Sequence, residues 1–144
     1  MNINIKRLTS TAIIPSLGTK ESAGVDLSAD ISENILIKPN EVVKIPTGLA
    51  VALPENTFGA IYARSGLATK QGLRPANCTG VIDRDYRGEI IVAIRNDSDE
   101  ARVIEPGQRI AQMVVIPYVG IDFVEVDSLD ETERDTGGFG STGK

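Results

Sequence analysis

Short apolar runs, separated by turn residues, fill most of this chain. The first run begins with the alternating residues Ile3 and Ile5 and ends near Leu8. Further runs rich in β-branched residues, which pack well in pleated strands, cover residues 35–37, 42–45, 49–53, 58–63, 89–94, 102–104, 110–116 and 123–126. Many short strands at regular spacing predict an all-β sandwich or barrel.

Glycine and proline interrupt the chain too often for long helices. There are 14 glycines and 7 prolines among the 144 residues. Only residues 65–71 have the pattern of a helical turn, which Gly72 would close. The sequence shows neither an internal repeat nor a second domain, so we expect a single β domain over residues 1–126.

The end of the chain has a different composition. Residues 127–134 are acidic and polar, and the following GGFGSTGK at residues 137–144 holds too much glycine for a strand. Its one aromatic residue, Phe139, has no core to fill. We therefore expect residues 127–144 to form a flexible C-terminal arm that folds over a flat ligand and closes an active site; simple disorder is the alternative.

The absence of histidine limits the possible chemistry. The chain has no His and one Cys, which excludes a Ser-His-Asp or Cys-His relay, an HExxH zinc site and an internal disulfide. Acid–base chemistry would fall to carboxylates, lysine, tyrosine or metal-bound water, and the expected metal is an oxygen-bound ion such as Mg²⁺.

The charge balance is acidic, with 15 Lys and Arg against 20 Asp and Glu and a net charge of -5. This disfavours binding to nucleic acid or to an anionic membrane, although a few arginines suffice for a small anion. No stretch reaches the length of a membrane span, and the N-terminus MNINIKRLTS does not resemble a signal peptide. We expect a cytoplasmic protein.

Two segments pair glycine with polar groups that packing does not require. In AGVDLSA, small residues surround Asp26, whose carboxylate could reach a metal-bound water or simply bond a turn. In ARSGLA, Arg64, Ser65 and Gly66 open the helical turn and offer a guanidinium, a hydroxyl and backbone N–H groups to a phosphate. A helix cap would explain Ser65 equally well, but it does not explain Arg64.

A third segment, NCTGVIDRDYRGE at residues 77–89, is typical of a hairpin with a charged turn. It would hold Asp83 beside Tyr86, so that the carboxylate could accept a proton from water and the ring could pack on a sugar or base. A solvated tip with ion pairs is the alternative. Cys78 is most simply a small buried apolar residue.

The tail adds phosphate ligands to these segments, because Arg134, Ser141 and Thr142 accompany Phe139 there. Together the four segments supply phosphate-binding groups, two carboxylates for Mg²⁺ and water, and two aromatic rings. This combination predicts a nucleotide site.

Five ordered motifs resemble those of the trimeric dUTPases. They cover residues 23–29, 63–68, 80–90 (GVIDRDYRGEI), 107–112 (GQRIAQ) and 134–143 (RDTGGFGSTG). The resemblance implies Mg²⁺-dependent hydrolysis of dUTP to dUMP and pyrophosphate, which keeps uracil out of DNA and supplies dUMP for thymidylate synthesis. It also implies a homotrimer of distorted jelly-roll-like β subunits, in which each of three active sites draws on all three chains.

The resemblance assigns a role to individual residues. Asp83 would orient and deprotonate the attacking water and touch the deoxyribose 3′-hydroxyl, and Asp26 would hold waters of the Mg²⁺ shell. Tyr86 would lie under the deoxyribose, and Phe139 would stack on uracil. The residues implied around the uracil edge are Asn77, Gly80, Val81, Ile82 and Ile91. The residues implied around the phosphates are Arg64, Ser65, Gly66 and Gln112, followed in the tail by Arg134, Gly140, Ser141 and Thr142.

The chain departs from the family pattern at two positions. Asp135 stands where the last motif usually has glycine, which adds a negative charge near the γ-phosphate and could weaken closure of the tail. Ala63 stands where proline is common, and we expect little effect from it.

Two alternative functions remain beside dUTP hydrolysis. The related dCTP deaminases carry a glutamate three residues before the asparagine that ends the strand after the charged turn. Here that asparagine is Asn96, and the residue three before it is Ala93, so the acid–base group for deamination is missing. A catalytically silent regulatory protein that binds a partner is the other alternative.

Overall fold

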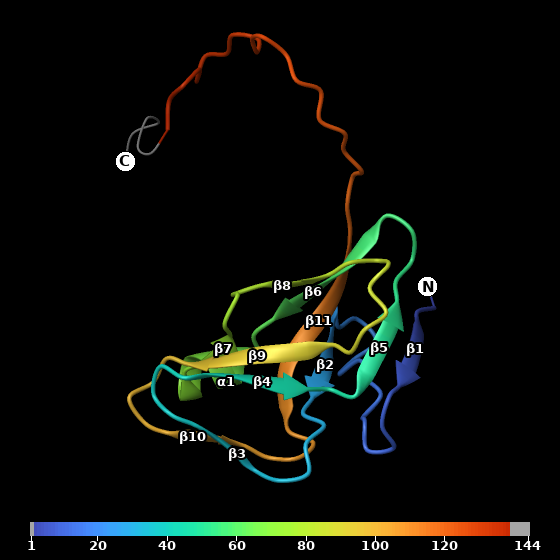
Figure 1. The fold of residues 1–144 in the computed structure, drawn as a ribbon, viewed down its shortest axis with the longest axis vertical. Coiled ribbons are helices and arrows are strands. Elements are labelled where there is room, and N and C mark those ends of the chain that lie inside the picture. Colours follow the sequence, from blue (N-terminus) through green and yellow to red (C-terminus); the bar gives the residue numbers. More distant parts are fainter. Residues whose placement is uncertain (1, 139–144) are drawn as a thin grey trace.

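Two antiparallel sheets lie face to face in the computed structural model, which describes residues 2–138 (Figure 1). The strands of the larger sheet, in spatial order, are β2 (Gly24–Ser28), β11 (Arg109–Pro117), β6 (Thr57–Tyr62) and β8 (Gly80–Ile82). The strands of the second sheet are β4 (Val42–Pro46), β9 (Ile91–Asn96) and β7 (Leu73–Pro75). Two further pairs join β1 (Asn4–Arg7) to β5 (Leu49–Ala52) and β3 (Ile35–Ile37) to β10 (Arg102–Ile104).

The one helix in the described part of the chain is α1 (Ser65–Gln71), as the pattern predicts. Gly72 ends it in the left-handed conformation, with φ 69°, and donates its N–H to the carbonyl of Leu67. A Cβ at Gly72 would lie 2.9 Å from the backbone nitrogen of Ser98, so glycine is required both for φ and for space. No helix within residues 2–138 is long and apolar enough to cross a membrane.

The core fills the space between the two sheets. Leu27 and Ala111 from the larger sheet and Ile45 and Ile94 from the second sheet are completely inaccessible to solvent. Asn96 is also fully buried, and its amide nitrogen donates to the carbonyl oxygens of Ile37 (3.0 Å) and Glu100 (2.8 Å). The predicted all-β class with one short helix is confirmed.

An ion-pair cluster ties the end of β9 to β7. Asp97 accepts from Nε of Arg95 at 2.6 Å and from Nε of Arg74 at 2.5 Å. The hydrogen bond from Arg95, followed by the contact with Arg74, lowers the pKa of Asp97 below its ordinary value despite some desolvation.

Two local predictions are wrong. Residues 80–82 and 91–96 do not form a hairpin: β8 pairs with β6, whereas β9 pairs with β4 and β7, so the charged turn crosses from one sheet to the other. The strand expected at residues 123–126 does not form, because this segment contacts no partner strand and Phe123 is 93% exposed.

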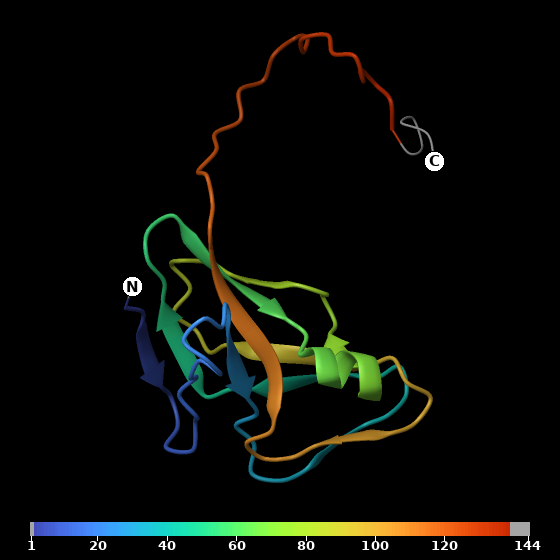
Figure 2. The same ribbon diagram turned by 180° about the vertical axis from the view of Figure 1, so that it is seen from behind.

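The chain leaves the sheets after β11. The N–H of Tyr118 donates to the carbonyl of Asn56 at 2.9 Å, and the following residues extend away from the body (Figures 1 and 2). Apolar side chains on this extension are highly exposed, including Val119 at 85% and Leu129 at 85%. The division into a domain up to residue 126 and an arm after it stays a prediction.

Candidate active site

Asp26 lies at one end of a polar row that crosses three strands. It stands on β2 opposite Gln112 of β11, and Gln112 stands opposite Tyr62 of β6. The Asp26 carboxylate accepts from Nε of Arg64 at 2.7 Å (Oδ1) and from Nη1 of Arg109 at 3.0 Å (Oδ2). The turn-bonding alternative for Asp26 is therefore wrong, because the residue lies within a strand and pairs with two arginines.

The backbone before Arg64 is held in place by Gln112. Its Nε2 donates to the carbonyl of Ala63 at 2.9 Å, and Arg64 follows with extended φ and ψ of -80° and 128°. A Cβ at Gly24 would lie 2.9 Å from Oε1 of Gln112, so the glycine leaves room for this amide. The family motif residue Gln112 thus positions the segment that carries Arg64.

The start of α1 provides an open surface for an anion. Ser65 and Gly66 are exposed, and no atom lies within 4 Å of a Cβ placed on Gly66. The first N–H groups of a helix have no partner inside it, and here they follow directly on the guanidinium of Arg64. The Ser65 side chain does not cap the helix, since the N-cap position belongs to Arg64 and makes no side-chain hydrogen bond.

A hollow of about 400 Å³ lies beside this cluster, lined by Asp26, Gln112, Tyr62 and neighbouring small residues. Tyr62 contributes to this lining from β6. Sequence reasoning missed Tyr62 and Arg109. Tyr62 lies two residues before Arg64, and Arg109 lies within GQRIAQ; the sequence offers no other signal for them.

The charged turn after β8 holds Asp83 and Tyr86 together, as predicted. The N–H of Tyr86 donates to the carbonyl of Asp83 at 3.1 Å, and the Tyr86 hydroxyl donates to the carbonyl of Glu89 at 3.0 Å. Any side chain at Gly88 would collide with the phenol of Tyr86, so this glycine allows the ring to lie against the turn.

A small cavity of about 170 Å³ gathers most of the residues implied around uracil and deoxyribose. Its lining consists of Val81, Ile82, Asp83, Tyr86, Glu89 and Ile91. Sequence reasoning missed Glu89. Its Oε1 accepts from the N–H of Gly48 at 2.7 Å, which fixes the end of the turn against the β5 segment.

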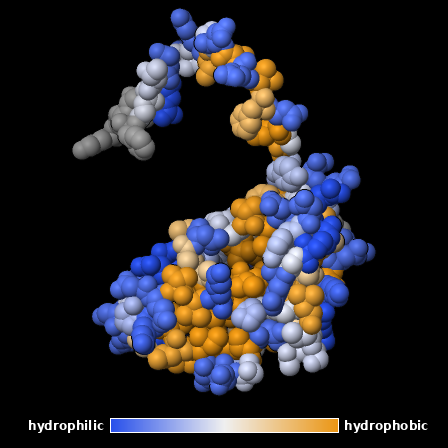
Figure 3. Space-filling view, viewed as in Figure 1, coloured by the Kyte–Doolittle hydropathy of each residue, from blue (hydrophilic) through white to orange (hydrophobic). Residues whose placement is uncertain are grey.

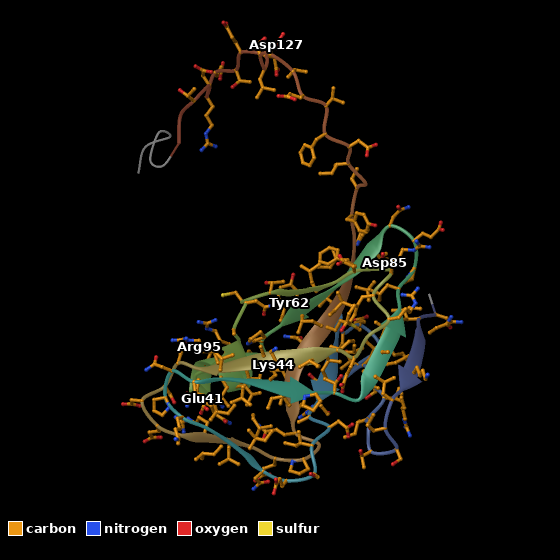
Figure 4. All side chains as sticks on the ribbon, in the orientation of Figure 1. Glu41, Lys44, Tyr62, Asp85, Arg95 and Asp127 are labelled. Carbon is orange, nitrogen blue, oxygen red and sulfur yellow. The ribbon has the colours of Figure 1, made fainter. Side chains whose placement is uncertain are left out.

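Asp83 also borders a second, larger hollow of about 510 Å³ on the charged turn. Phe58 and Tyr118 line it with Val81 and with the charged residues Asp83, Arg84 and Asp85. Asp85 lies at the end of the molecule from which the C-terminal extension departs (Figure 4). The candidate base is therefore accessible from two sides.

The turn before β8 is exposed at Asn77 and Cys78. Cys78 has φ 61°, and its Sγ accepts a hydrogen bond from Nη1 of Arg74 at 3.5 Å. The prediction of a buried Cys78 is wrong, because the turn directs this residue into solvent. Nδ2 of Asn77 lies 3.4 Å from the Cβ position of Gly80, at the start of the predicted uracil-reading backbone.

Asp83 and Arg64 lie at opposite ends of β6. Ile82 pairs with Gly59, so Asp83 continues past the early part of β6, whereas Arg64 follows its end. The distance from Gly59 to Arg64 is roughly 16 Å of extended chain at about 3.3 Å per residue. Within one chain, the structure thus separates the candidate water-activating carboxylate from the candidate phosphate-binding cluster.

The described part of the tail ends at residue 138. Nε of Arg134 donates to the carbonyl of Gly137 at 3.0 Å, and Asp135 has a positive φ of 43°. The predicted site residues Phe139, Gly140, Ser141 and Thr142 lie outside the described residues.

The oxygen ligands of the candidate site fit a Mg²⁺ ion that is held mainly by the phosphates of the nucleotide. Within residues 2–138 no cluster of three or more His, Cys, Asp or Glu side chains could hold a metal. Asp26 already accepts three guanidinium contacts, including Nη2 of Arg64 at 3.4 Å, and a carboxylate offers about four acceptor positions. This leaves Asp26 room for a metal-bound water, in a site where phosphate oxygens would supply the direct ligands.

A family model named dUTPase matches residues 10–143. The chain belongs to the dUTPase family. The deoxyuridine 5′-triphosphate nucleotidohydrolase of Desulfitobacterium hafniense is 53% identical over 131 residues, which are 90% of this chain and 87% of the relative. The enzyme of the same name from Nautilia profundicola is 48% identical over 144 residues and covers 100% of both chains.

Solved structures of dUTPases share the fold. A mutant dUTPase of Staphylococcus bacteriophage 80alpha with dUpNHpp superposes with a TM-score of 0.89 at 29% identity, covering 99% of each chain. A mutant dUTPase of the Staphylococcus aureus phage phi11, described with a structural Mg(II) ion, gives a TM-score of 0.78 at 26% identity, covering 89% of this chain and 98% of the phage chain. The predicted family and the jelly-roll-like fold are confirmed.

Proposed function

We propose that this chain is a cytoplasmic homotrimeric dUTPase that hydrolyses dUTP to dUMP and pyrophosphate with Mg²⁺. Its substrate is a small molecule, and neither nucleic acid nor a membrane is a partner. The reaction keeps uracil out of DNA and supplies dUMP for thymidylate synthesis. The observation that carries the proposal is where the family motifs lie in the fold. They form an anion site around Arg64, and they hold the accessible carboxylate of Asp83 beside a small pocket.

Asp83 is the general base in this proposal. It is exposed on a turn, and no Lys or Arg within residues 2–138 forms a salt bridge with it, so its carboxylate is available to a water molecule. The water proton passes to Asp83 while the water oxygen bonds to the α-phosphorus. The bond from that phosphorus to the bridging oxygen breaks, and pyrophosphate leaves.

Arg64, Ser65, Gly66 and Gln112 bind the α- and β-phosphates. The fixed guanidinium and the first N–H groups of α1 offer donors toward one open surface, which suits phosphate oxygens. Mg²⁺ bound to the triphosphate supplies further charge neutralisation during attack on phosphorus. Asp26 contributes through water to its shell and, by direct contact, holds Arg64.

The pocket at the charged turn selects the nucleoside. Backbone groups of Gly80, Val81 and Ile82, together with Ile91 and Asn77, read the uracil edge. The ring of Tyr86, held through its bond to Glu89, lies under the deoxyribose and leaves no room for a 2′-hydroxyl. Tight packing of this backbone against the base would exclude the thymine methyl group.

Assembly of three chains would bring the two separated halves of the site together. Asp83 of one subunit then meets Arg64 of the next, which a single chain does not allow. Exposed apolar residues support such an assembly, and apolar atoms gather on the face that carries β3, β4, β9 and β10 (Figure 3). Large exposed apolar side chains of these strands are Leu36, Val42, Ile91 and Val103.

The C-terminal arm supplies the third part of the proposed active site. Residues 127–144 close over the nucleotide, with Phe139 stacked on uracil and Arg134, Gly140, Ser141 and Thr142 around the γ-phosphate. The extended course and exposed apolar residues of the described segment support an arm that reaches another subunit, since it makes few contacts with its own body.

Deamination of dCTP is disfavoured by the strand that would carry its acid. Ala93 lies in β9, and Asn96, which ends that strand, is committed to structural hydrogen bonds. The silent regulatory alternative predicts nucleotide binding without turnover, although Asp26, Arg64 and Asp83 all retain their functional groups.

A nucleotide panel tests the proposal. Purified protein with Mg²⁺ should release pyrophosphate from dUTP and scarcely from dTTP, dCTP or UTP, measured by a coupled pyrophosphate assay. Equal turnover of dTTP would contradict the pocket assignment, and absence of turnover with retained dUTP binding would favour the regulatory alternative. Light scattering on the same sample should give three times the chain mass.

A further inference from the structure

Two arginines share one carboxylate beside the candidate phosphate site. Asp26 accepts Nε of Arg64 on Oδ1 at 2.7 Å and Nη1 of Arg109 on Oδ2 at 3.0 Å. Nη2 of Arg64 also faces Oδ2, but at 3.4 Å, which is longer than a well-formed hydrogen bond. Arg109 thus shares, at the shorter distance, the carboxylate oxygen that Arg64 would need for a two-pronged pair.

This arrangement affects which donors of Arg64 remain free. A guanidinium commonly binds a carboxylate through two parallel N–H···O bonds, which fixes both groups and uses two of its five N–H donors. Here Arg64 is anchored mainly through Nε, so its terminal nitrogens stay available for another anion. The cluster of Asp26 with two arginines also keeps a net positive charge, whereas a simple Asp26–Arg64 pair would be neutral.

The position of Arg109 is set by the fold. It begins β11, opposite Ser28 of β2, at a register irregularity between Arg109 and Ala111. The Arg109 side chain is 61% exposed, so its ion pair adds little to folding stability. Its contact with Asp26 therefore calls for an explanation other than stability.

We propose that Arg109 is a positioning residue for phosphate binding: by competing with Arg64 for Oδ2 of Asp26, it keeps the contact from Nη2 of Arg64 long and leaves the terminal Arg64 nitrogens turned to the nucleotide phosphates. This inference rests on the proposed function. It assigns Arg109 a role that acts through Asp26 and Arg64, without direct contact to the reacting atoms.

If Arg109 has this role, its replacement should weaken nucleotide binding more as the number of phosphates on the nucleotide increases. In Arg109→Gln, Arg64 pairs with both oxygens of Asp26, and the dissociation constant of dUpNHpp should rise about tenfold, within the range of coupling between contacting charges. Binding of dUMP should weaken less. The KM for dUTP should rise more than kcat falls, and Arg109→Lys, which keeps the charge on Asp26, should restore part of the affinity.

The matched control is Arg95→Gln, since Arg95 is another half-exposed arginine paired with an aspartate, Asp97, on the second sheet. It should leave nucleotide binding unchanged. Calorimetry of both variants should give nearly equal melting temperatures, and if Arg109→Gln does not fold, Arg109→Lys provides the comparison.

A double-mutant cycle separates positioning from direct binding. If Arg109 acts through Asp26, then Arg109→Gln should cost much less affinity in an Asp26→Asn background, because the shared anchor is already weakened. An equal loss in both backgrounds, or an equal loss for dUMP and dUpNHpp, would overturn the inference. If the wild type hydrolyses dUTP and Arg109→Gln binds dUpNHpp with unchanged affinity, the inference is also overturned. If the wild type does not bind dUTP at all, the proposed function itself is contradicted.

Discussion

Two aspartates of the candidate site differ in their surroundings more than in their sequence context. Asp26 is enclosed by Arg64 and Arg109, so its charge is already neutralised. Asp83 has no salt-bridge partner within residues 2–138 and borders two hollows. The first residue suits orientation of other groups, whereas the second suits acceptance of a proton.

Replacing Asp83 with Asn should abolish most turnover while leaving nucleotide binding intact. The amide has nearly the same shape but cannot accept the water proton, and loss of a general base costs roughly 10²–10⁴-fold in rate. Steady-state kcat for dUTP and calorimetric titration with dUpNHpp would measure the two effects. Turnover at the wild-type rate would remove Asp83 from the role of base.

Asp135 provides a second test at the level of one residue. Its φ of 43° lies in the left-handed region that glycine adopts without strain, and its charge follows directly on Arg134. Asp135→Gly should therefore ease closure of the arm and lower the KM for dUTP by a few-fold, with kcat nearly unchanged. An increase in KM would show that the carboxylate assists closure.

At the level of elements, the apolar runs predicted nearly every strand that contains β-branched residues. The strands at 35–37 and 102–104 and helix α1 have the expected bounds. β2 was missed because AGVDLSA contains small and polar residues, and β7 because it has no β-branched residue and ends in proline. The hairpin predicted for residues 80–82 and 91–96 did not form. Turn residues therefore indicate where the chain reverses, but they do not show which strands pair with each other.

Only the local part of the candidate site could be predicted from the sequence. Asp83 and Tyr86 are close in sequence, so local spacing was enough to place them together. Arg109 meets Asp26 only because β2 and β11 are neighbours, across 83 residues of sequence. Contacts of that kind depend on strand order, which the sequence pattern does not contain.

Replacing glycine by alanine should have opposite effects on the free energy of unfolding at the two ends of α1. Gly72→Ala should destabilise the protein by about 1–3 kcal/mol, since alanine is strained at φ 69° and its Cβ would approach Ser98. Gly66→Ala should stabilise it by about 0.5–1 kcal/mol, because it lies in the helix with open space around it. Urea unfolding measures both, and a stabilising Gly72→Ala would contradict the cap geometry.

At the level of the whole molecule, the body and the C-terminal arm carry separate properties. No residue of the described arm belongs to the buried core, whose members lie between residues 12 and 113. Folding should therefore depend on the two sheets, and activity on both parts.

Truncation after residue 136 should test that division. We expect the melting temperature to change little, because the core of the described chain lies between residues 12 and 113, while kcat/KM for dUTP falls by orders of magnitude. Differential scanning calorimetry and the pyrophosphate assay measure the two quantities. A collapse of the melting temperature would show that the end of the arm is structural.

The separation of Asp83 and Arg64 at opposite ends of β6 also has a genetic consequence. If each site combines Asp83 of one subunit with Arg64 of another, two inactive variants, Asp83→Asn and Arg64→Gln, should complement each other when they are refolded together. Random trimers at equal amounts would contain about a quarter of intact sites, because each of two independent subunits must be of the right kind. Recovered activity near that fraction of wild type would mean that two defective alleles can together sustain one working enzyme.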